Sequence, residues 1–171
     1  MAVNLSKCDK FVAQAIETWQ TTQMHDLGFT MTDMSTGKDY MYVLYNDGAG
    51  TVVGSIGAPV GIYCLANALV GSATTVTADV TDSANGVPLG VLRGAPTDGQ
   101  YGFIELVKKG IVTTVLCDTA DPAQYQYYKW SADSLLTSMV MTSAIADPQL
   151  AVAKSMDSDA ALVGYQNVAW L

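Results

Sequence analysis

Turn signals recur along this chain and separate short stretches that are rich in β-branched and aromatic residues. They return roughly every 8 to 15 residues, which is the spacing typical of β-sandwiches and β-barrels. The clearest are Asn46-Asp47-Gly48, Asn85-Gly86, Asp98-Gly99 and Lys108-Lys109-Gly110. The alternation of strands with helices that marks a parallel α/β sheet does not accompany them. The sequence therefore predicts a mainly β protein built from short antiparallel strands.

The strands are expected between these turns. They cover residues 30–32, 39–45, 51–56, 60–66, 74–80, 87–92, 101–107, 111–117, 124–130 and 160–171. The stretches 101–107 and 111–117 are separated by a short turn, so we expect them to pair as a hairpin. Residues 134–142 fit either a short helix or a strand, because apolar residues at helical spacing are mixed there with β-branched ones.

One helix is expected, near the N-terminus. Residues 8–20 carry apolar side chains at helical spacing, and residues 1–7 would form an arm ahead of this helix. We therefore divide the chain into an N-terminal arm with an amphipathic helix, residues 1–28, and a β domain, residues 29–171. The β domain is expected to be a small antiparallel β-barrel or sandwich that stays folded when the arm and helix are removed.

The charge of the chain argues against binding to nucleic acid. The formal net charge is −8, and only 14% of the residues are charged. Apart from Lys108-Lys109, the basic residues of the β domain stand singly, whereas phosphate binding needs clustered Lys and Arg. We therefore expect no nucleic-acid partner. So low a charged fraction indicates instead that partner proteins cover much of the surface.

Residues 48–78 contain no charged side chain, which raises the question of a membrane span. Pro59, Asn67 and several Gly, Ser and Thr residues interrupt this run. Its longest polar-free stretch, residues 57–66, is about half of the ~20 residues that a spanning helix requires. A buried pair of strands explains the run better, so we expect no membrane partner. Residues 1–10 lack the pattern of a secretory signal, which predicts synthesis in the cytoplasm.

Few residues are available for catalysis or metal binding. Cys8, Cys64 and Cys117 are widely spaced and are expected to be reduced, mostly buried thiols. His25 is the single histidine, and a surface or capping role is favoured for it because nothing nominates a nucleophile. Residues 79–86 resemble a calcium loop, but a strand end followed by an Asn-Gly turn explains them better. We expect no enzymatic activity, no cofactor and no metal.

An aromatic stretch, residues 125–130, is the most suggestive surface feature. It could stack sugars or fill a subunit interface, but we favour the core face of one strand. Together with apolar residues of the arm and helix, it supplies the candidate interface residues. They are Val3, Leu5, Phe11, Ile16, Trp19, Tyr125, Tyr127 and Trp130.

The middle of the chain resembles a known family. Residues 86–92 read Gly-Val-Pro-Leu-Gly-Val-Leu, residues 97–106 read Thr-Asp-Gly-Gln-Tyr-Gly-Phe-Ile-Glu-Leu, and residues 109–112 read Lys-Gly-Ile-Val. This succession is similar to that of capsid decoration (cement) proteins of tailed phages and of related head-fibre proteins. The likeness covers about residues 40–117 and, more weakly, the C-terminus.

The resemblance implies a β-barrel or tulip-like fold, assembly as a homotrimer, and a position on the major capsid protein at the exterior of the virion. It implies no active site. Decoration requires a wide contact area across subunit boundaries, so residues 1–28 are expected to pack on a neighbour or on the capsid. The alternative is a head-fibre or spike module that binds host glycans through the aromatic stretch.

Overall fold

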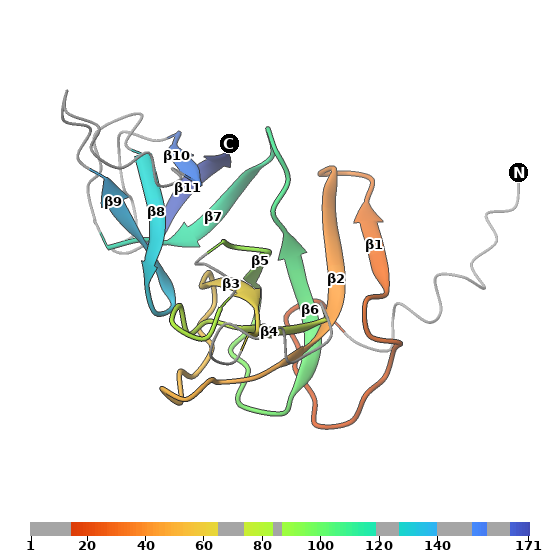
Figure 1. The fold of residues 1–171 in the computed structure, drawn as a ribbon. Coiled ribbons are helices and arrows are strands. Elements are labelled where there is room, and N and C mark those ends of the chain that lie inside the picture. The colour runs from red at the N-terminus through yellow and green to blue at the C-terminus, as the bar shows by residue number, and fades with distance from the viewer. Residues whose placement is uncertain (1–14, 65–73, 84–86, 119–126, 140–151, 157–164) are drawn as a thin grey trace, which may run out of the picture.

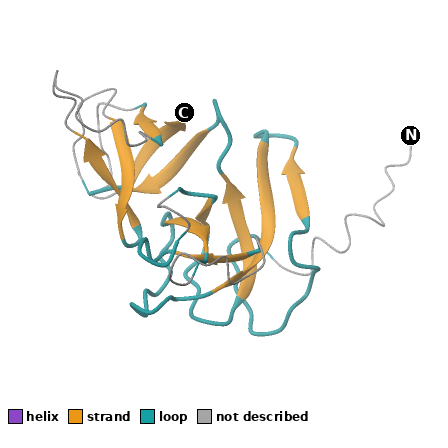
Figure 2. Ribbon diagram, in the orientation of Figure 1, coloured by secondary structure: helices purple, strands orange, loops and turns teal. Residues whose placement is uncertain are grey.

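The computed structural model describes residues 15–64, 74–83, 87–118, 127–139, 152–156 and 165–171 (Figure 1). Within these ranges the chain forms eleven strands and no helix (Figure 2). The strands are β1 (Thr30–Asp33), β2 (Lys38–Tyr45), β3 (Pro59–Ile62), β4 (Thr75–Thr77), β5 (Gly90–Leu92), β6 (Tyr101–Leu106), β7 (Val112–Leu116), β8 (Tyr127–Ala132), β9 (Leu135–Met139), β10 (Ala153–Ser155) and β11 (Tyr165–Trp170). The prediction of a mainly β fold is confirmed. In the described part of the chain, no helix has the length and apolar content needed to cross a membrane.

Strand β2 closes the first sheet on itself. Along one edge it pairs antiparallel with β6, and along the other it pairs with β1 near its beginning and, in parallel, with β4 at its end. Strand β4 pairs with β3, β3 pairs with β5, and β5 pairs with β6. Together with β2, these four strands form a closed barrel. Closure matters because an open sheet edge invites pairing with other chains.

Alternation along β2 separates the barrel interior from its outer face. Val43 and Tyr45 are fully buried inside, and the Tyr45 hydroxyl donates a 2.6 Å hydrogen bond to the carbonyl oxygen of Val52. Burial raises the pKa of this phenol well above its usual range. The interior is mainly aliphatic, as a small barrel requires. Its buried residues are Val43, Tyr45, Ala58, Val60, Val76, Ala78, Leu92 and Ile104.

A tryptophan of the N-terminal segment closes one end of the barrel. The Trp19 indole lies against two glycines, Gly94 and Gly102, where an added Cβ would come within 2.6 and 2.5 Å of its ring atoms. Next to it, Gln20 exchanges two backbone hydrogen bonds, of 3.0 and 2.7 Å, with Tyr101 of β6. This segment is therefore part of the first sheet's packing.

The helix expected over residues 8–20 is wrong in its described part. Residues 15–20 contain a turn and then an extended residue that pairs with β6. The apolar spacing is real, but Ile16 and Trp19 contact the barrel from an irregular segment and not from one face of a helix. Residues 8–14 lie outside the described ranges.

Aromatic side chains cover the outer face of β2 and β6. Tyr42 and Phe103 lie opposite each other on the two strands, with 5.0 Å between their ring centroids. The segment before β1 folds over them. His25 meets the Tyr42 ring edge-on at 5.1 Å, and the Tyr42 hydroxyl accepts a 3.0 Å hydrogen bond from the Met24 amide. These contacts fix the segment to the outside of the barrel.

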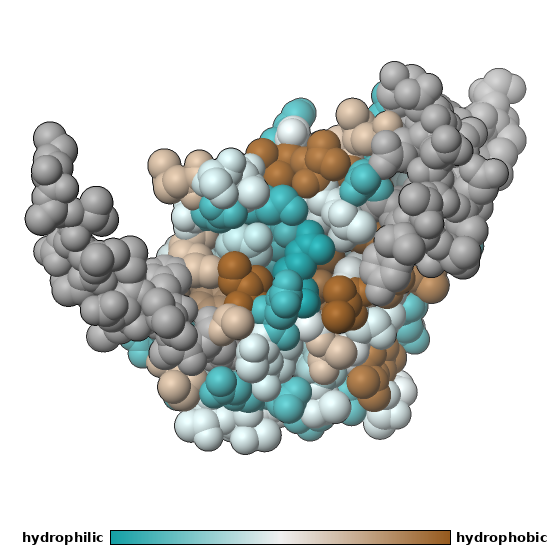
Figure 3. All heavy atoms as spheres, turned by 180° about the vertical axis from the view of Figure 1, so that it is seen from behind, coloured by the Kyte–Doolittle hydropathy of each residue, from teal (hydrophilic) through white to brown (hydrophobic). Residues whose placement is uncertain are grey.

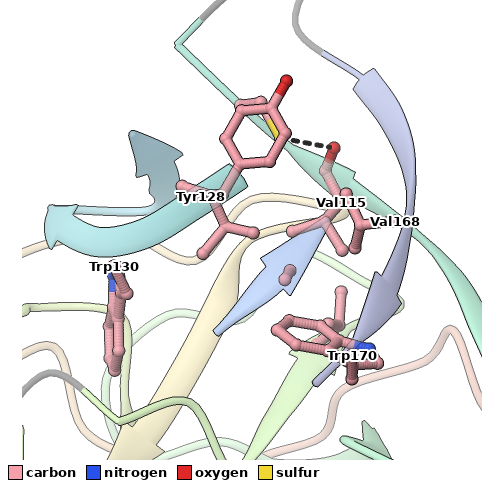
Figure 4. Close-up of a cluster of buried hydrophobic side chains, with 9 residues drawn as sticks. Val115, Tyr128, Trp130, Val168 and Trp170 are labelled. Carbon is pink, nitrogen blue, oxygen red and sulfur yellow. Dashed lines mark hydrogen bonds between the residues drawn. The ribbon is translucent and has the colours of Figure 1, made fainter. Parts of the chain in front are cut away.

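Strands β7 to β11 form a second sheet, in the order β7-β11-β10-β8-β9, with antiparallel neighbours. It curls until Cys117, just after β7, pairs with Leu136 of β9 through a single bridge. Aromatic rings converge with smaller side chains on its inner face (Figure 4). The buried cluster consists of Val91, Val115, Cys117, Tyr128, Trp130, Leu136, Ala153, Val168 and Trp170.

The strand pairings show that two of the sequence-based predictions are wrong and resolve a third that was ambiguous. Strands β6 and β7 do not pair as a hairpin, because β2 and β5 occupy both edges of β6 and β7 pairs with β11. Residues 51–56 form a loop and not a strand, since the Gly54 amide bonds to the Pro96 carbonyl oxygen of another loop. The ambiguous stretch 134–142 is a strand, β9, in its described part.

Candidate functional site

A buried carboxylate joins the two sheets. Glu105 of β6 is 1% exposed and accepts hydrogen bonds from three other segments. Arg93 donates from Nε at 2.7 Å and also from Nη2. Lys38 of β2 places its Nζ 3.1 Å from Oε1, and Thr113 of β7 donates from Oγ1 at 2.7 Å. Arg93 also reaches the Thr114 carbonyl oxygen at 3.3 Å. A buried charge is tolerated only when it is paired in this way, so the network holds β7 to the barrel.

The turn between β8 and β9 provides a second contact between the sheets. Ser134, which has a φ of 61°, donates its amide to the Ala78 carbonyl oxygen at 3.0 Å. The Asp133 carboxylate accepts a 2.9 Å hydrogen bond from the Val80 amide. Together with the 2.8 Å hydrogen bond from the Leu116 amide of β7 to the Gly57 carbonyl oxygen, these contacts fix the second sheet on the barrel, and the outer surfaces of both keep a set orientation.

The eight candidate interface residues have different surroundings. Those outside the described ranges are Val3, Leu5, Phe11 and Tyr125. Ile16 packs on the outer aromatic cluster, and Trp19 closes the barrel. Trp130 is 4% exposed, and its ring lies where an added Cβ at Gly61 would come within 2.7 Å of it. Tyr127 alone among the described candidates lies on the outer face of the second sheet.

Neighbouring aromatic residues of β8 point to opposite faces. Tyr128 is fully buried, whereas Tyr127 is partly exposed and lies opposite Lys154 of β10. The Lys154 ammonium group is 5.7 Å from the centroid of the Tyr127 ring. Lys129 is exposed two residues further along β8, on the same face as Tyr127. Among the side chains that the structure describes, the outer face thus includes the Tyr127 ring and two lysines.

Aspartates gather around the loop that follows β2, residues 46–58. They are Asp47, Asp79, Asp82, Asp98 and Asp133. Asp82 accepts the Ala49 amide at 2.6 Å, and Asp79 accepts the Gly50 amide at 3.1 Å. Over the described ranges, the three ion pairs use Glu105 and Asp39 and none of these five carboxylates. This end of the barrel is therefore negatively charged and lacks a basic counterpart within the described chain.

Metal-binding and nucleophilic residues are not brought together. The described ranges hold no group of three His, Cys, Asp or Glu side chains placed to bind a metal ion. His25 stacks on Phe29, with 5.5 Å between centroids, and is partly buried there. Cys64 and Cys117 are buried thiols, as predicted, and burial raises the pKa of Cys117 to about 12. Cys8 lies outside the described ranges.

Sequence reasoning missed several exposed apolar residues, Met34, Val53 and Ile56 among them, and the buried Glu105. Met34, in the β1–β2 turn, is 89% exposed, and Val53 and Ile56 are 59% and 52% exposed. Val53 and Ile56 belong to a stretch that resembles a strand in composition, so the sequence conceals their loop position. Glu105 did leave a signal, since it is one charged residue within an otherwise uncharged strand.

Apolar groups are distributed over the surface. On the face shown in Figure 3, separate apolar groups lie on either side of a hydrophilic band. Such a face offers extended contact area of mixed character, which is the usual composition of non-obligate protein interfaces.

The fold is similar to that of a phage protein. The head fiber gp8.5 N base in bacteriophage phi29 matches this chain with a TM-score of 0.52 and 8% sequence identity, covering 77% of this chain and 92% of that one. At this identity the likeness concerns the fold. No protein-family model matches the sequence, and no curated protein matches it either.

Proposed function

We propose that this chain is a structural, non-enzymatic protein of a phage head, which decorates the capsid exterior as a homotrimer bound to the major capsid protein. The fold shared with the phi29 head fibre base, over 77% of this chain, is the observation that carries the proposal. The motif likeness of residues 86–112 to decoration and head-fibre proteins adds support, because it comes from sequence and not from topology.

The junction around Glu105 suits this role. A protein that clasps neighbouring subunits benefits from contact surfaces held in place beforehand, because freezing mobile groups on binding lowers affinity. Arg93 and Thr113 bind one buried carboxylate from the two sheets, so barrel and second sheet present their surfaces together.

Association with capsids tests the proposal. The purified chain, mixed with shells assembled from the major capsid protein of the same genome, should co-sediment with them and saturate at a fixed stoichiometry. Shells of an unrelated phage control for adsorption. Failure to co-sediment with its own shells, at concentrations where the chain is folded, contradicts the proposal.

Thermal release of DNA provides a second measurement. The DNA in a filled head presses outward on the shell, and an added outer clamp should resist this pressure. Heads that carry the chain should therefore release their DNA at a higher temperature than heads that lack it. Equal release temperatures would remove the stabilising role.

The N-terminal arm is proposed to contact the capsid. The deletion that tests this contact ends at residue 14, because Trp19 and Gln20 are bound to the barrel. Without residues 1–14, the chain should keep its melting temperature and lose capsid association. Normal decoration by the truncated chain would show that the contact lies elsewhere.

Binding of host glycans is the second candidate function. Tyr127 supports it, since this ring lies on the outer face beside Lys154. The Trp130 ring packs inside and offers no stacking surface. Glycan-array binding that disappears in Tyr127→Ala would support this role, and binding that persists would assign it to other residues.

A further inference from the structure

Strand β1 forms an open edge of the first sheet. Within the described chain it pairs with β2 and with no other strand, and it lies at the border of the sheet (Figure 1). Phe29, just before β1, accepts a 2.8 Å hydrogen bond from the Tyr42 amide. Antiparallel residue pairs alternate between bonded and non-bonded, so Met31 turns its backbone groups toward β2, whereas Thr30 and Thr32 turn theirs away. The edge of β1 therefore offers backbone donors and acceptors to an additional strand.

The side chains at this edge divide into an apolar and a polar face. Met31 borders the outer aromatic cluster and is only partly buried, and Phe29 next to it is 36% exposed. Thr30 and Thr32 are exposed on the opposite face. Strand β1 contains no lysine or proline, the residues that commonly block a sheet edge. The edge thus suits a strand with apolar side chains on one face and polar side chains on the other.

The N-terminal arm has this pattern in its sequence. Val3 and Leu5 are apolar and alternate with Asn4 and Ser6, as in a half-buried strand. Successive side chains of a strand point to opposite faces. A strand that places its two apolar residues beside Met31 therefore brings its two polar residues to the face of the threonines. Both faces of β1 are matched by the same segment.

The arm is attached close to this edge. The described chain begins at Ala15, and the next residue, Ile16, packs on the same aromatic cluster as Met31. Residues 7–14 can span up to about 28 Å, whereas β1 is about 13 Å long. A segment on so short a tether reaches an effective concentration of about millimolar at a nearby site. This favours the copy's own arm over the arm of a second copy in dilute solution.

We propose that residues 3–6 pair with the free edge of β1 in the same copy, as an additional strand of the first sheet. The pairing protects an edge that otherwise invites other chains. Strand β1 lies outside the ring of strands that closes the barrel, so the arm can detach below the melting temperature and leave the barrel intact. The inference goes beyond the proposed function, because it concerns the free chain. An added strand keeps an edge of its own for the capsid contact.

Hydrogen exchange of single amides tests the pairing. The amides of Thr30 and Thr32 should exchange more slowly in the full chain than in the chain without residues 1–14, by about tenfold or more. The Met31 amide faces β2 in both chains and should exchange equally, which provides an internal control. Equal exchange of the threonine amides in the two chains overturns the inference.

Proline substitutions locate the pairing within the arm. Asn4→Pro combined with Leu5→Pro removes two neighbouring amides, and one of them faces β1 in either register. This variant should lose the protection of the threonine amides. Val12→Pro combined with Ala13→Pro, in the linking residues, is the matched control and should keep it. Protection that survives the first variant, or that is lost in the control, contradicts the assignment of the paired segment.

Dilution separates pairing within one copy from an exchange of arms between copies. Protection by the copy's own arm should not change with protein concentration. Protection that falls on dilution would assign the edge to the arm of a second copy and overturn the inference. Capsid co-sedimentation is a separate measurement. Shell binding by a chain whose threonine amides lack protection would reject the pairing and retain the proposed decoration, and protected amides in a chain that fails to bind shells would do the reverse.

Discussion

The barrel and the second sheet protect their edges to different extents. In the barrel, β2 and β6 pair over five successive residue pairs and complete the circuit of strands. The second sheet approaches closure through one bridge, between Cys117 and Leu136. Backbone pairing therefore holds the barrel together, whereas the second sheet depends more on its side chains and on its neighbour.

The buried cores of the barrel and of the second sheet also differ, in the kind of side chain that fills them. The barrel interior is largely aliphatic, but the second core contains three large aromatic rings, those of Tyr128, Trp130 and Trp170. It also includes Val91, which belongs to β5 of the barrel. The comparison teaches that the second sheet completes its core on the barrel, so that its stability should depend on the barrel more than the reverse.

The largest expected effect comes from the ring between the sheets. Trp130→Ala should lower the free energy of unfolding by about 4 kcal/mol, because it empties a buried site lined by both sheets. Denaturation with guanidinium measures this change. Tyr127→Ala, three residues earlier in β8 but on the outer face, should change it by less than about 1 kcal/mol. Equal losses in the two variants would mean that the second core does not rest on the barrel.

The second-largest effect is expected from replacing Arg93, which binds Glu105 between the two sheets. Arg93→Met leaves the buried Glu105 carboxylate without its two guanidinium hydrogen bonds and should lower the free energy of unfolding by about 3 kcal/mol. It should also separate the unfolding of the second sheet from that of the barrel, visible as two transitions.

The control for this variant is an exposed pair. Lys108→Met removes the 2.9 Å contact to Asp39, and both side chains there are partly exposed to solvent. The loss should be small, because solvent and salt screen an exposed ion pair. A single cooperative transition in Arg93→Met, with a loss no larger than in Lys108→Met, would show that Glu105 does not hold the sheets together.

Local strand patterns were predictable where one strand separates two surfaces. Residues 39–45 alternate between inside and outside, and the structure places β2 within one residue of that stretch. Pairing partners were not predictable, because they depend on edges formed by distant segments. The sequence favours a hairpin of β6 with β7, yet closure of the barrel by β2 and β5 leaves β6 with no free edge.

The candidate site shows the same limit. Periodicity identifies residues 125–130 as strand-like, but it cannot say which aromatic ring faces outward, since Tyr127 and Tyr128 are adjacent. Burial of Tyr128 decides this in the structure. Trp19 likewise carries a helical spacing in sequence, while its position is set by two glycines about 75 and 83 residues further along the chain, Gly94 and Gly102.

The fit between Trp19 and Gly102 should be sensitive to one methyl group. Gly102→Ala places a Cβ within 2.5 Å of the indole and should lower the free energy of unfolding by about 2 kcal/mol. In Trp19→Ala the obstacle is absent, so adding Gly102→Ala to it should cost less than it does alone. Additive losses in this double-mutant cycle would mean that the barrel end does not depend on their contact.

The smallest effect should be a dependence on acid at the negatively charged end of the barrel. Burial raises the pKa of Asp79, but hydrogen bonds from Thr81 and from the Gly50 amide outweigh it, and the net pKa is lowered. Because the pKa of Asp79 is lower in the folded chain than in the unfolded chain, its ionised carboxylate stabilises the fold at pH values above the unfolded pKa, near 4. This stabilisation is lost as the pH falls through the lower pKa of the folded chain. Asp79→Asn should therefore be less stable than the unaltered chain at neutral pH, and the difference should shrink below about pH 4. Hydrogen bonds from Ser35 and Thr36 also lower the pKa of Asp33, to about 2. Asp33 is present in both the unaltered chain and Asp79→Asn, so its contribution cancels when their unfolding free energies are subtracted. A difference in unfolding free energy that stays constant with pH would show that the loop does not hold Asp79 in its ionised form.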